Sequence, residues 1–328
     1  MSKICTRRTF LHYIGALSSG TLLMPLYGCN SSSPISIAAH PWPGYEFMFL
    51  ARDLGWVNKE LVSFKETLSA SETIELLAKG EVDAGALTLD EVLRARESGI
   101  ALSVVLLFDI SAGADIVLAK PAIKHLSQIK GKRIGVELSA VGAIMLDQLL
   151  KKAGLSKTDI SIVELSIDKQ LQAWKSDRID IVITYEPIAS QLQAFGATKL
   201  FSSSEAPDLI FDVLAVREDR LNHTNAIIHI INAHFKAQNH FYNNKEDALY
   251  RLASRLGLAS RKVPSAYQGL ILPSYNNNLR LLSGDNPAII KKTQKLISVM
   301  QKNHLLDQNA STKDLFTNTF IQRLYNEN

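Results

Sequence analysis

The chain has 328 residues, of which 46% are hydrophobic and 21% are charged, and its formal net charge is +4. This length and apolar content suffice for two modest folded domains. Three of the positive charges, Lys3, Arg7 and Arg8, lie before Cys29, where there is no acidic residue. The rest of the chain is therefore nearly neutral, which excludes the basic footprint of a nucleic-acid-binding protein.

The N-terminus predicts export. The basic residues precede an apolar stretch, residues 10–26, that is too short for a membrane span of about 20 apolar residues. The end of this stretch resembles a bacterial lipobox, in which a cysteine is acylated and the chain is cut before it, and reads Leu26-Tyr27-Gly28-Cys29. We therefore expect a signal peptide over residues 1–28, a lipid on Cys29 and a flexible tether over residues 29–34. The protein would lie in the periplasm or at the cell surface, anchored to a membrane.

The two cysteines, Cys5 and Cys29, add a further constraint. Because Cys5 leaves with the signal peptide and Cys29 carries lipid, we expect no disulfide and no cysteine-bound metal. The basic start also resembles a twin-arginine export signal and reads Thr6-Arg7-Arg8-Thr9-Phe10-Leu11. Paired arginines occur in ordinary signal peptides as well, so both export routes stay open.

Short apolar runs alternate with amphipathic stretches, which is the pattern of an α/β fold. In the first part, we expect strands at residues 36–39, 62–64, 84–87 and 102–108, and helices at residues 45–54, 71–79 and 90–98. Ser71 is expected to cap the second helix and Gly80 to end it. The long apolar run at residues 102–108 predicts a buried, central strand.

The same rhythm restarts after residues 109–115. We expect strands at residues 116–119, 133–136, 160–164, 179–184 and 209–216, and helices at residues 140–153, 168–176 and 187–195. From about residue 225 onward the pattern predicts an almost wholly helical tail.

Five blocks of sequence lie in order between residues 36 and 217. They are Trp42-Pro43-Gly44-Tyr45-Glu46 with residues 50–55, then residues 77–84, residues 126–136, Thr184-Tyr185-Glu186-Pro187, and residues 211–216. Together they resemble the periplasmic binding proteins for nitrate, sulfonates, taurine and thiamine-pyrimidine precursors. The resemblance implies an α/β, two-lobed type II periplasmic-binding fold with two hinge crossovers, in which the ligand is enclosed between the lobes.

The resemblance also implies a domain organisation and partners. Lobe 1 would comprise residues 35–110 and 212–328, including the helical tail, and lobe 2 would comprise residues 111–211. The protein would act as a monomer, without cofactor or metal, and deliver a small molecule to an ABC permease and ATPase complex.

Ligands of open α/β sheets bind beyond the carboxyl ends of the strands. Residues 40–45, 69–71, 88–90, 138–143 and 184–186 are expected to occupy that position, with Asp109 and Asp212 at the proposed crossovers. The candidate ligand-binding residues are Trp42, Tyr45, Ser71, Thr88, Asp90, Asp109, Ser139, Val141, Gly142, Tyr185, Glu186 and Asp212.

Several of these candidates have a structural explanation beside the functional one. Trp42 and Tyr45 flank Gly44, so their rings could cover a flat or cationic ligand, or Trp42 could simply plug the lobe. Residues 69–71 and 139–143 open helices whose free N–H groups could meet an anion, although ordinary capping explains their serines equally well. His40 follows a strand, a place where histidine is more often structural.

Glu186 is the sharpest candidate for charge recognition. It follows a strand and precedes Pro187 at an expected helix start, where a carboxylate also complements the helix dipole. Asp90, Asp109 and Asp212 lie at comparable places, and the five segments contain no Lys or Arg. An acid-rich cleft without basic residues favours a ligand with an amine or another cationic group.

The sequence favours a binding protein over an enzyme. It has no Gly-x-Ser-x-Gly elbow, no phosphate-binding glycine loop, no His-Glu-x-x-His and no cysteine after Cys29. The pyrimidine synthases of thiamine biosynthesis share the implied fold but carry a cysteine-rich motif that this chain lacks. A sensor subunit would bind the same ligand and signal to a membrane receptor, so importer and sensor roles both stay open.

Overall fold

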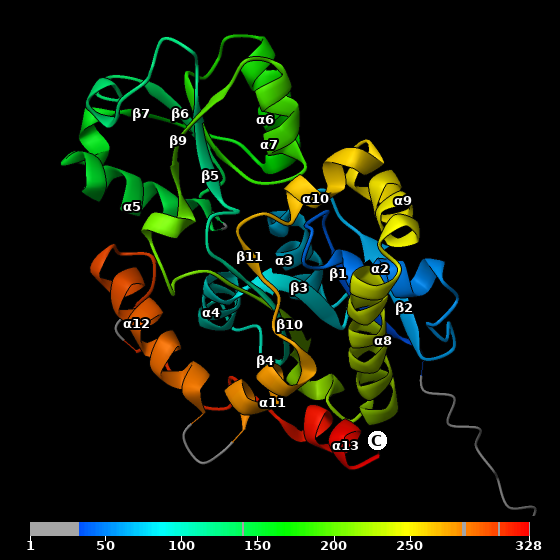
Figure 1. Ribbon diagram of the computed structural model, residues 1–328. Helices are drawn as coiled ribbons and strands as arrows, with labels where there is room; N and C mark the ends of the chain where they lie inside the picture. Colours follow the sequence, from blue (N-terminus) through cyan, green and yellow to red (C-terminus); the bar gives the residue numbers. More distant parts are fainter. Residues whose placement is uncertain (1–32, 140, 284–286, 308, 328) are drawn as a thin grey trace, which may run out of the picture. The chain divides into compact units, whose positions relative to one another are not determined.

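A computed structural model describes residues 33–139, 141–283, 287–307 and 309–327 (Figure 1). Residues Ser33–Asn328 form one compact unit, and the expected signal peptide and Cys29 lie outside the described residues. The described chain contains a six-stranded sheet, in the order β11-β4-β10-β3-β1-β2, and a five-stranded sheet, in the order β7-β6-β8-β5-β9. This two-sheet α/β arrangement agrees with the fold class expected from the sequence.

The first three strands of the chain are parallel neighbours in the six-stranded sheet. Its strands are β1 (Ile35–Ala39), β2 (Val62–Glu66), β3 (Ala84–Thr88), β4 (Leu102–Ser111), β10 (Phe211–Arg217) and β11 (Leu270–Ile271). The helices between them are α2 (Glu46–Asp53), α3 (Ala70–Lys79) and α4 (Leu89–Glu97). β1 pairs in parallel with β2 and β3, so the carboxyl ends of these strands point to one edge of the sheet.

The five-stranded sheet repeats this pattern on a smaller scale. Its strands are β5 (Ile116–Ala119), β6 (Arg133–Val136), β7 (Ser161–Glu164), β8 (Ile181–Thr184) and β9 (Thr198–Ser202). The connecting helices are α5 (Gly142–Ala153), α6 (Ile167–Lys175) and α7 (Ile188–Ala194). β6 is parallel to β7 and β8, whereas β5 is antiparallel to β8 and β9.

The chain passes between the two sheets twice, through residues 112–115 and 203–210. β4 leads out of the six-stranded sheet and β10 returns to it, and these strands pair antiparallel with Asp109 opposite Asp212. The two crossing segments are tied together because the Ser203 hydroxyl lies 2.8 Å from that of Ser111 and accepts from the Gly113 amide at 2.7 Å. The two sheets are therefore connected by two chain segments that are hydrogen-bonded to each other.

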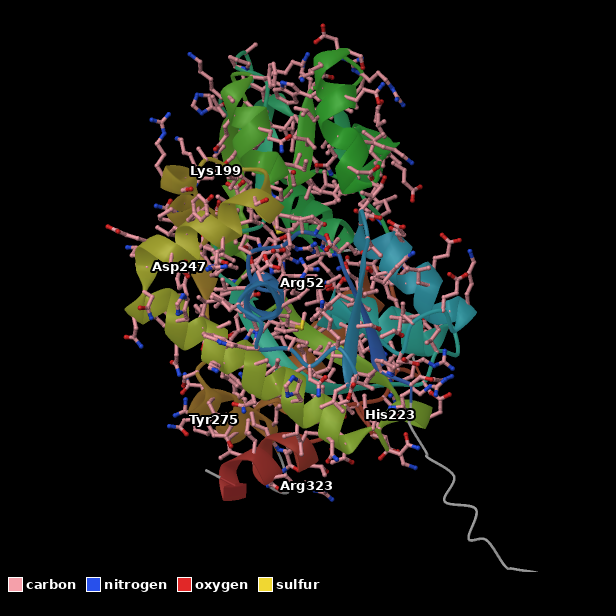
Figure 2. The ribbon with its side chains drawn as sticks, turned by 90° about the vertical axis from the view of Figure 1, so that its right-hand side faces the viewer. Arg52, Lys199, His223, Asp247, Tyr275 and Arg323 are labelled. Atoms are coloured by element: carbon pink, nitrogen blue, oxygen red, sulfur yellow. The ribbon has the colours of Figure 1, made fainter. Side chains whose placement is uncertain are left out.

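The C-terminal helices pack on the six-stranded sheet. They are α8 (Thr224–Asn243), α9 (Lys245–Leu256), α10 (Val263–Ala266), α11 (Tyr275–Leu282), α12 (Ala288–Lys302) and α13 (Thr319–Glu327). Helices α8 and α9 contact α2, α12 contacts α4, and α13 contacts β4. Figure 2 shows this layer from the side, with Asp247 on α9 and Arg323 on α13. The tail thus belongs to the same core as β1–β4.

The tail also closes the free edge of β4. The buried Asn278 side chain accepts from the Leu107 amide at 2.8 Å and donates to the Leu107 carbonyl at 2.9 Å. The Val104 amide donates to the carbonyl of Leu315. β11 continues the same edge, and at its start Gly269 approaches Gly113 so closely that a Cβ atom would lie 2.5 Å from the Gly113 carbonyl carbon. Exposed strand edges invite aggregation, and here a side-chain amide replaces a missing strand.

Most of the strands and helices expected from the sequence are confirmed, with ends that shift by a few residues. The cap of α3 is a correction, because Ser69, not Ser71, accepts from the Glu72 amide at 3.2 Å. β9 and β11 were not predicted. β9 is half exposed at a sheet edge, so the apolar alternation of a buried strand is missing, and β11 has two residues.

Candidate functional site

A small cavity lies where the carboxyl ends of β1, β3 and β8 meet the crossing segments. It is lined by His40, Trp42, Tyr45, Thr88, Glu91, Asp115, Val141, Tyr185 and Asp212. These residues lie near the strand ends of both sheets, in the crossing segment 112–115 and on β10. The cavity has a volume of about 10 Å³, which is enough for one group of the size of a water molecule.

Aromatic rings form much of the cavity wall. The ring centroids of Trp42 and Tyr185 lie 5.3 Å apart, edge to face, and those of Trp42 and Tyr45 lie 6.5 Å apart. His40 packs against both tyrosines at 5.4 and 5.8 Å. Burial lowers the pKa of His40 to about 3, with a further contribution from the charge of Arg255, so this histidine is neutral at physiological pH. Such a wall suits a flat or cationic group.

The paired carboxyl groups of Asp109 and Asp212 are oriented by these aromatic residues. The Trp42 indole N–H donates to Asp109 Oδ2 at 3.0 Å, and the Tyr45 hydroxyl donates to Asp212 Oδ1 at 2.6 Å. Burial raises the pKa of Asp109 to about 7. Burial and the neighbouring charges of Asp109 and Asp115 raise the pKa of Asp212 well above its usual range.

Three residues that line the cavity carry buried oxygen atoms that lack a standard hydrogen bond. Within the described part of the chain, no donor pairs with Asp115 Oδ2 or Asp212 Oδ2, and Thr88 Oγ1 makes no hydrogen bond of standard geometry although it faces the Glu91 amide. Thr88 also faces the first turn of α4 in a capping box with Glu91. Burial raises the pKa of Asp115 to about 7. Unpaired buried polar groups are costly in a folded protein, so their concentration in one cavity points to a binding role.

Beside the cavity, polar contacts join the two sheets. Glu91 Oε1 accepts from the Val141 amide at 3.3 Å, and the Ser71 hydroxyl lies 2.5 Å from the Ser139 hydroxyl and donates to Glu137. Arg94, on the following turn of α4, donates to the carbonyl of Leu138 at 2.7 Å. These contacts join the first turn of α3 and the first two turns of α4 to the segment before α5.

The structure brings six of the candidate residues to the cavity, and the rest take other positions. The six are Trp42, Tyr45, Thr88, Val141, Tyr185 and Asp212. Asp109 bonds to Trp42, Ser71 and Ser139 bond to each other, and Asp90 is buried with both carboxylate oxygens unpaired among the described residues. Gly142 lies against β6, where a Cβ atom would be 2.7 Å from the Glu137 carbonyl oxygen.

Glu186, which the sequence favoured for charge recognition, does not line this cavity. Its carboxylate accepts from the Ser190 amide at 3.0 Å and from the Ser190 hydroxyl at 2.8 Å, so it caps the first turn of α7. It lines a separate cavity of about 460 Å³ together with Lys199 and Lys262. The physical reason is local, because α7 begins two residues after Glu186 and its free amides draw the carboxylate back.

Sequence reasoning missed Glu91 and Asp115 and gave His40 little weight. Glu91 carried a signal, because Thr88 and Glu91 have the spacing of a capping box at the end of a strand. Asp115 lies in the crossing segment, where nothing in the local sequence indicates which way its side chain points.

The described residues contain no group of His, Cys, Asp and Glu side chains arranged to hold a metal ion. Among them, too, no helix has the length and apolar character that crossing a membrane requires.

The two-sheet fold is that of two-lobed periplasmic binding proteins. The periplasmic nitrate-binding protein of Synechocystis PCC 6803 matches with a TM-score of 0.74 and 11% identity, covering 90% of this chain and 89% of its own. The alkanesulfonate-binding protein of Xanthomonas axonopodis pv. citri, bound to MOPS, matches with a TM-score of 0.72 and 18% identity, covering 87% of this chain and 98% of its own.

The sequence places the chain in a family. Residues 42–248, more than half of the chain, match the family described as NMT1/THI5 like, and the chain belongs to this family. The taurine-binding periplasmic protein of Escherichia coli (strain K12) is 25% identical over 249 residues, which are 72% of this chain and 77% of that protein. The 4-amino-5-hydroxymethyl-2-methylpyrimidine phosphate synthase of Saccharomyces cerevisiae is 26% identical over 180 residues, covering 53% of this chain and 52% of its own. The resemblance found in the sequence is thereby confirmed.

Proposed function

We propose that the protein is an exported solute-binding protein that captures a small cationic organic molecule between two lobes and delivers it to an ABC importer. The observation that carries this proposal is the cavity itself, with aromatic walls and unpaired carboxyl oxygens between two sheets. The relative named for taurine binding supports the general class. The lobes would be residues 35–110 with 212–328, and residues 111–211, connected by the two crossing segments.

The charge of the cavity supports an amine-bearing ligand. Glu91, Asp115 and Asp212 line it, and no Lys or Arg does so among the described residues. The ionised carboxylates would repel a free sulfonate or nitrate, whereas an ammonium group would favour their ionised forms against the rise in pKa that burial causes. In this proposal, Asp212 keeps the role that the sequence had assigned to it together with Glu186, and Asp115 takes the place of Glu186.

A hinge motion is part of the proposal. A cavity of about 10 Å³ cannot admit an organic molecule without movement. The contacts of Ser71, Glu91 and Arg94 with residues 137–139 and 141 would break on opening and form again on closure. The two crossing segments would act as the hinge.

Binding and closure can be measured directly. Small-angle scattering of the purified protein should show a smaller radius of gyration with a stabilising amine than without it, because the lobes close on the ligand. The amine is first identified by thermal shift, since a hundredfold excess over Kd adds about 2.7 kcal/mol of stability. An unchanged radius at saturation would contradict a hinged binding protein.

We also propose that Cys29 anchors the protein through a lipid, on the basis of the sequence preceding it. The Cys29→Ser variant should appear in the soluble fraction in folded form, because acyl chains contribute about 0.8 kcal/mol per buried CH₂. Fractionation after a salt wash measures this. Retention of the variant in the membrane fraction would refute the lipobox interpretation.

A further inference from the structure

The chemistry of the unpaired oxygens in the central cavity is more specific than a negative charge. Asp115 Oδ2 and Asp212 Oδ2 are carboxylate oxygens, and Thr88 Oγ1 is a hydroxyl oxygen. All three residues line the same water-sized cavity, and their exposed fractions are 3%, 2% and 6%. A hydroxyl oxygen has two lone pairs, so Thr88 can accept from a ligand even while it faces the first turn of α4.

We propose that these three oxygens bind the ammonium group of a primary amine. This inference rests on the proposed solute-binding function and assigns the part of the ligand that the cavity recognises. A primary ammonium has three N–H donors, one for each of these three oxygens, and it is close to a water molecule in size. His40 Nδ1 is a further buried atom of the cavity wall without a partner among the described residues. The cavity therefore fits the head group of the ligand, and the rest of the ligand enters as the lobes open and close.

The surroundings favour a cation of this kind. Asp109 and Asp90 add buried carboxyl groups beside Asp212 and Asp115, and the neighbouring rings of Trp42, Tyr45 and Tyr185 add their π faces. Glu91 also lines the cavity, but its two oxygens accept from the Thr88 and Val141 amides. His40 is neutral, and the described residues that line the cavity include no Lys or Arg to compete with the ammonium group.

The same geometry predicts discrimination against methylated amines. Aromatic walls alone would accept a quaternary ammonium through cation–π contacts. A trimethylammonium group, however, has no N–H donor and exceeds a cavity of about 10 Å³. It would leave the buried oxygens of Asp115, Asp212 and Thr88 unpaired, which is the situation in which a binding site rejects an analogue most strongly.

The experiment uses two ions that isolate the head group. The unfolding temperature of the purified protein is measured in about 100 mM methylammonium chloride, tetramethylammonium chloride or sodium chloride, because so small a fragment binds in the millimolar range at best. We expect methylammonium to raise the unfolding temperature by about 2 °C over the other two salts. In Asp115→Asn this difference should vanish, whereas Asp147→Asn, which removes a half-buried carboxylate of α5 outside the cavity, should retain it.

Equal unfolding temperatures in methylammonium and tetramethylammonium would overturn the ammonium site, as would an undiminished difference in Asp115→Asn. If Asp115→Asn does not fold, Asp212→Asn serves as the second variant with the same expectation. A parallel screen separates this inference from the proposed function. A stabilising compound without a primary amine that shrinks the radius of gyration would keep the solute-binding function and refute the ammonium site, whereas a methylammonium effect without any closing ligand would count against the function alone.

Discussion

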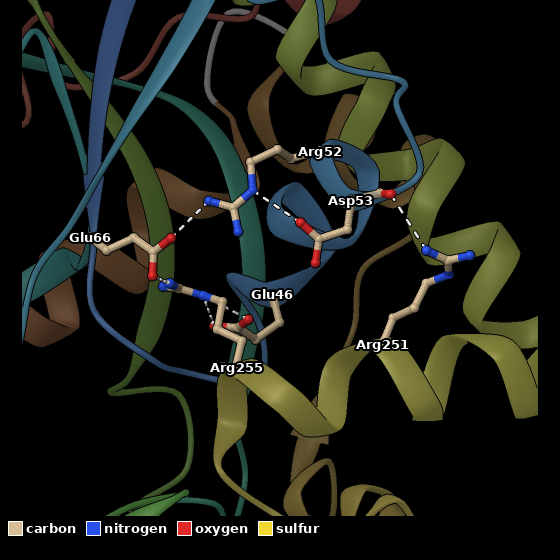
Figure 3. A network of polar contacts seen from close by, with 6 residues as sticks. All are labelled: Glu46, Arg52, Asp53, Glu66, Arg251 and Arg255. Atoms are coloured by element: carbon tan, nitrogen blue, oxygen red, sulfur yellow. Dashed lines mark hydrogen bonds and ion pairs between the residues drawn. The ribbon is translucent and has the colours of Figure 1, made fainter.

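Replacing Arg255 with methionine should lower the free energy of unfolding by about 3–5 kcal/mol, because it leaves a buried carboxylate without its partner. Arg255 reaches from α9 to α2, where its Nε lies 2.9 Å from Glu46 Oε2 (Figure 3). The Glu46 side chain is 1% exposed and that of Arg255 is 10% exposed. The guanidinium also bonds to Glu66 and stacks 3.4 Å from the centroid of the Phe49 ring. One side chain thus ties the tail to the N-terminal sheet.

The loss should depend on pH. Burial raises the pKa of Glu46 to about 7, and Arg255 acts in the opposite direction, so the pKa rises further when Arg255 is removed. A carboxyl whose folded pKa exceeds its unfolded value contributes stability that is present at low pH and is lost as the pH rises through the folded pKa. The deficit of Arg255→Met should therefore be larger at pH 8 than at pH 5.

Denaturant unfolding at both pH values measures this prediction, and α9 offers a matched control. Arg251 forms an exposed ion pair with Asp247 four residues earlier, and such a pair contributes less than about 1 kcal/mol. Arg251→Met should therefore have a small effect, and adding Glu46→Gln to Arg255→Met should restore much of the loss. Equal losses for the two arginine variants would show that the tail is not held by the Glu46 pair.

The second large effect concerns Asp212, whose replacement by asparagine should weaken binding of the cationic ligand at least a hundredfold. That factor corresponds to about 2.7 kcal/mol and lies within the range for removing one partner of a buried charge pair. Asparagine keeps the shape and the oxygen that accepts from the Tyr45 hydroxyl, so the variant removes the charge and little else. Titration calorimetry with the amine from the screen measures the change.

The same variant should be more stable than the wild type without ligand. The pKa of Asp212 is raised by burial and by Asp109, so its ionised form costs stability, and that cost grows as the pH rises. We expect Asp212→Asn to be more stable than the wild type at pH 8 and equally stable near pH 4. Asp180→Asn is the contrasting control, because Arg133 lowers the pKa of Asp180 to about 2. It should lose a little stability and bind normally. A less stable Asp212→Asn with unchanged affinity would contradict the functional role of Asp212.

Much of the fold could be predicted because its local signals agree with one another. Apolar runs, helix caps and the glycines after α3 and α5 mark the βα units, and the strand ends indicate where a ligand site should form. Trp42, Tyr45 and Asp212 were predicted in this way, and all three line the cavity. The long-range features carried no such signal, and Asn278, which completes the edge of β4, is one example.

The differences between the expected and the observed positions of the site residues have a common physical cause. A residue near a helix start can point into the cleft or cap its own helix, and the sequence does not separate these outcomes. Glu186 caps α7, whereas Glu91 caps α4 and lines the cavity at the same time. Asp115 was missed because its direction depends on how the two crossing segments bond to each other.

The measurement that tests the central claim most directly is a thermal-shift comparison of small amines, sulfonates, nitrate and pyrimidines on the wild type and Asp212→Asn. Three two-carbon compounds in this panel distinguish the effect of a positive from that of a negative charge. 2-Aminoethanol is a cation, 2-hydroxyethanesulfonate is an anion, and 2-aminoethanesulfonate carries both groups. Because Asp115 and Asp212 line the cavity, compounds with an ammonium group should raise the unfolding temperature of the wild type. In Asp212→Asn this rise in unfolding temperature should be lost. Stabilisation by the sulfonates and nitrate, equal in the wild type and the variant and absent with 2-aminoethanol, would contradict a cation-binding cavity.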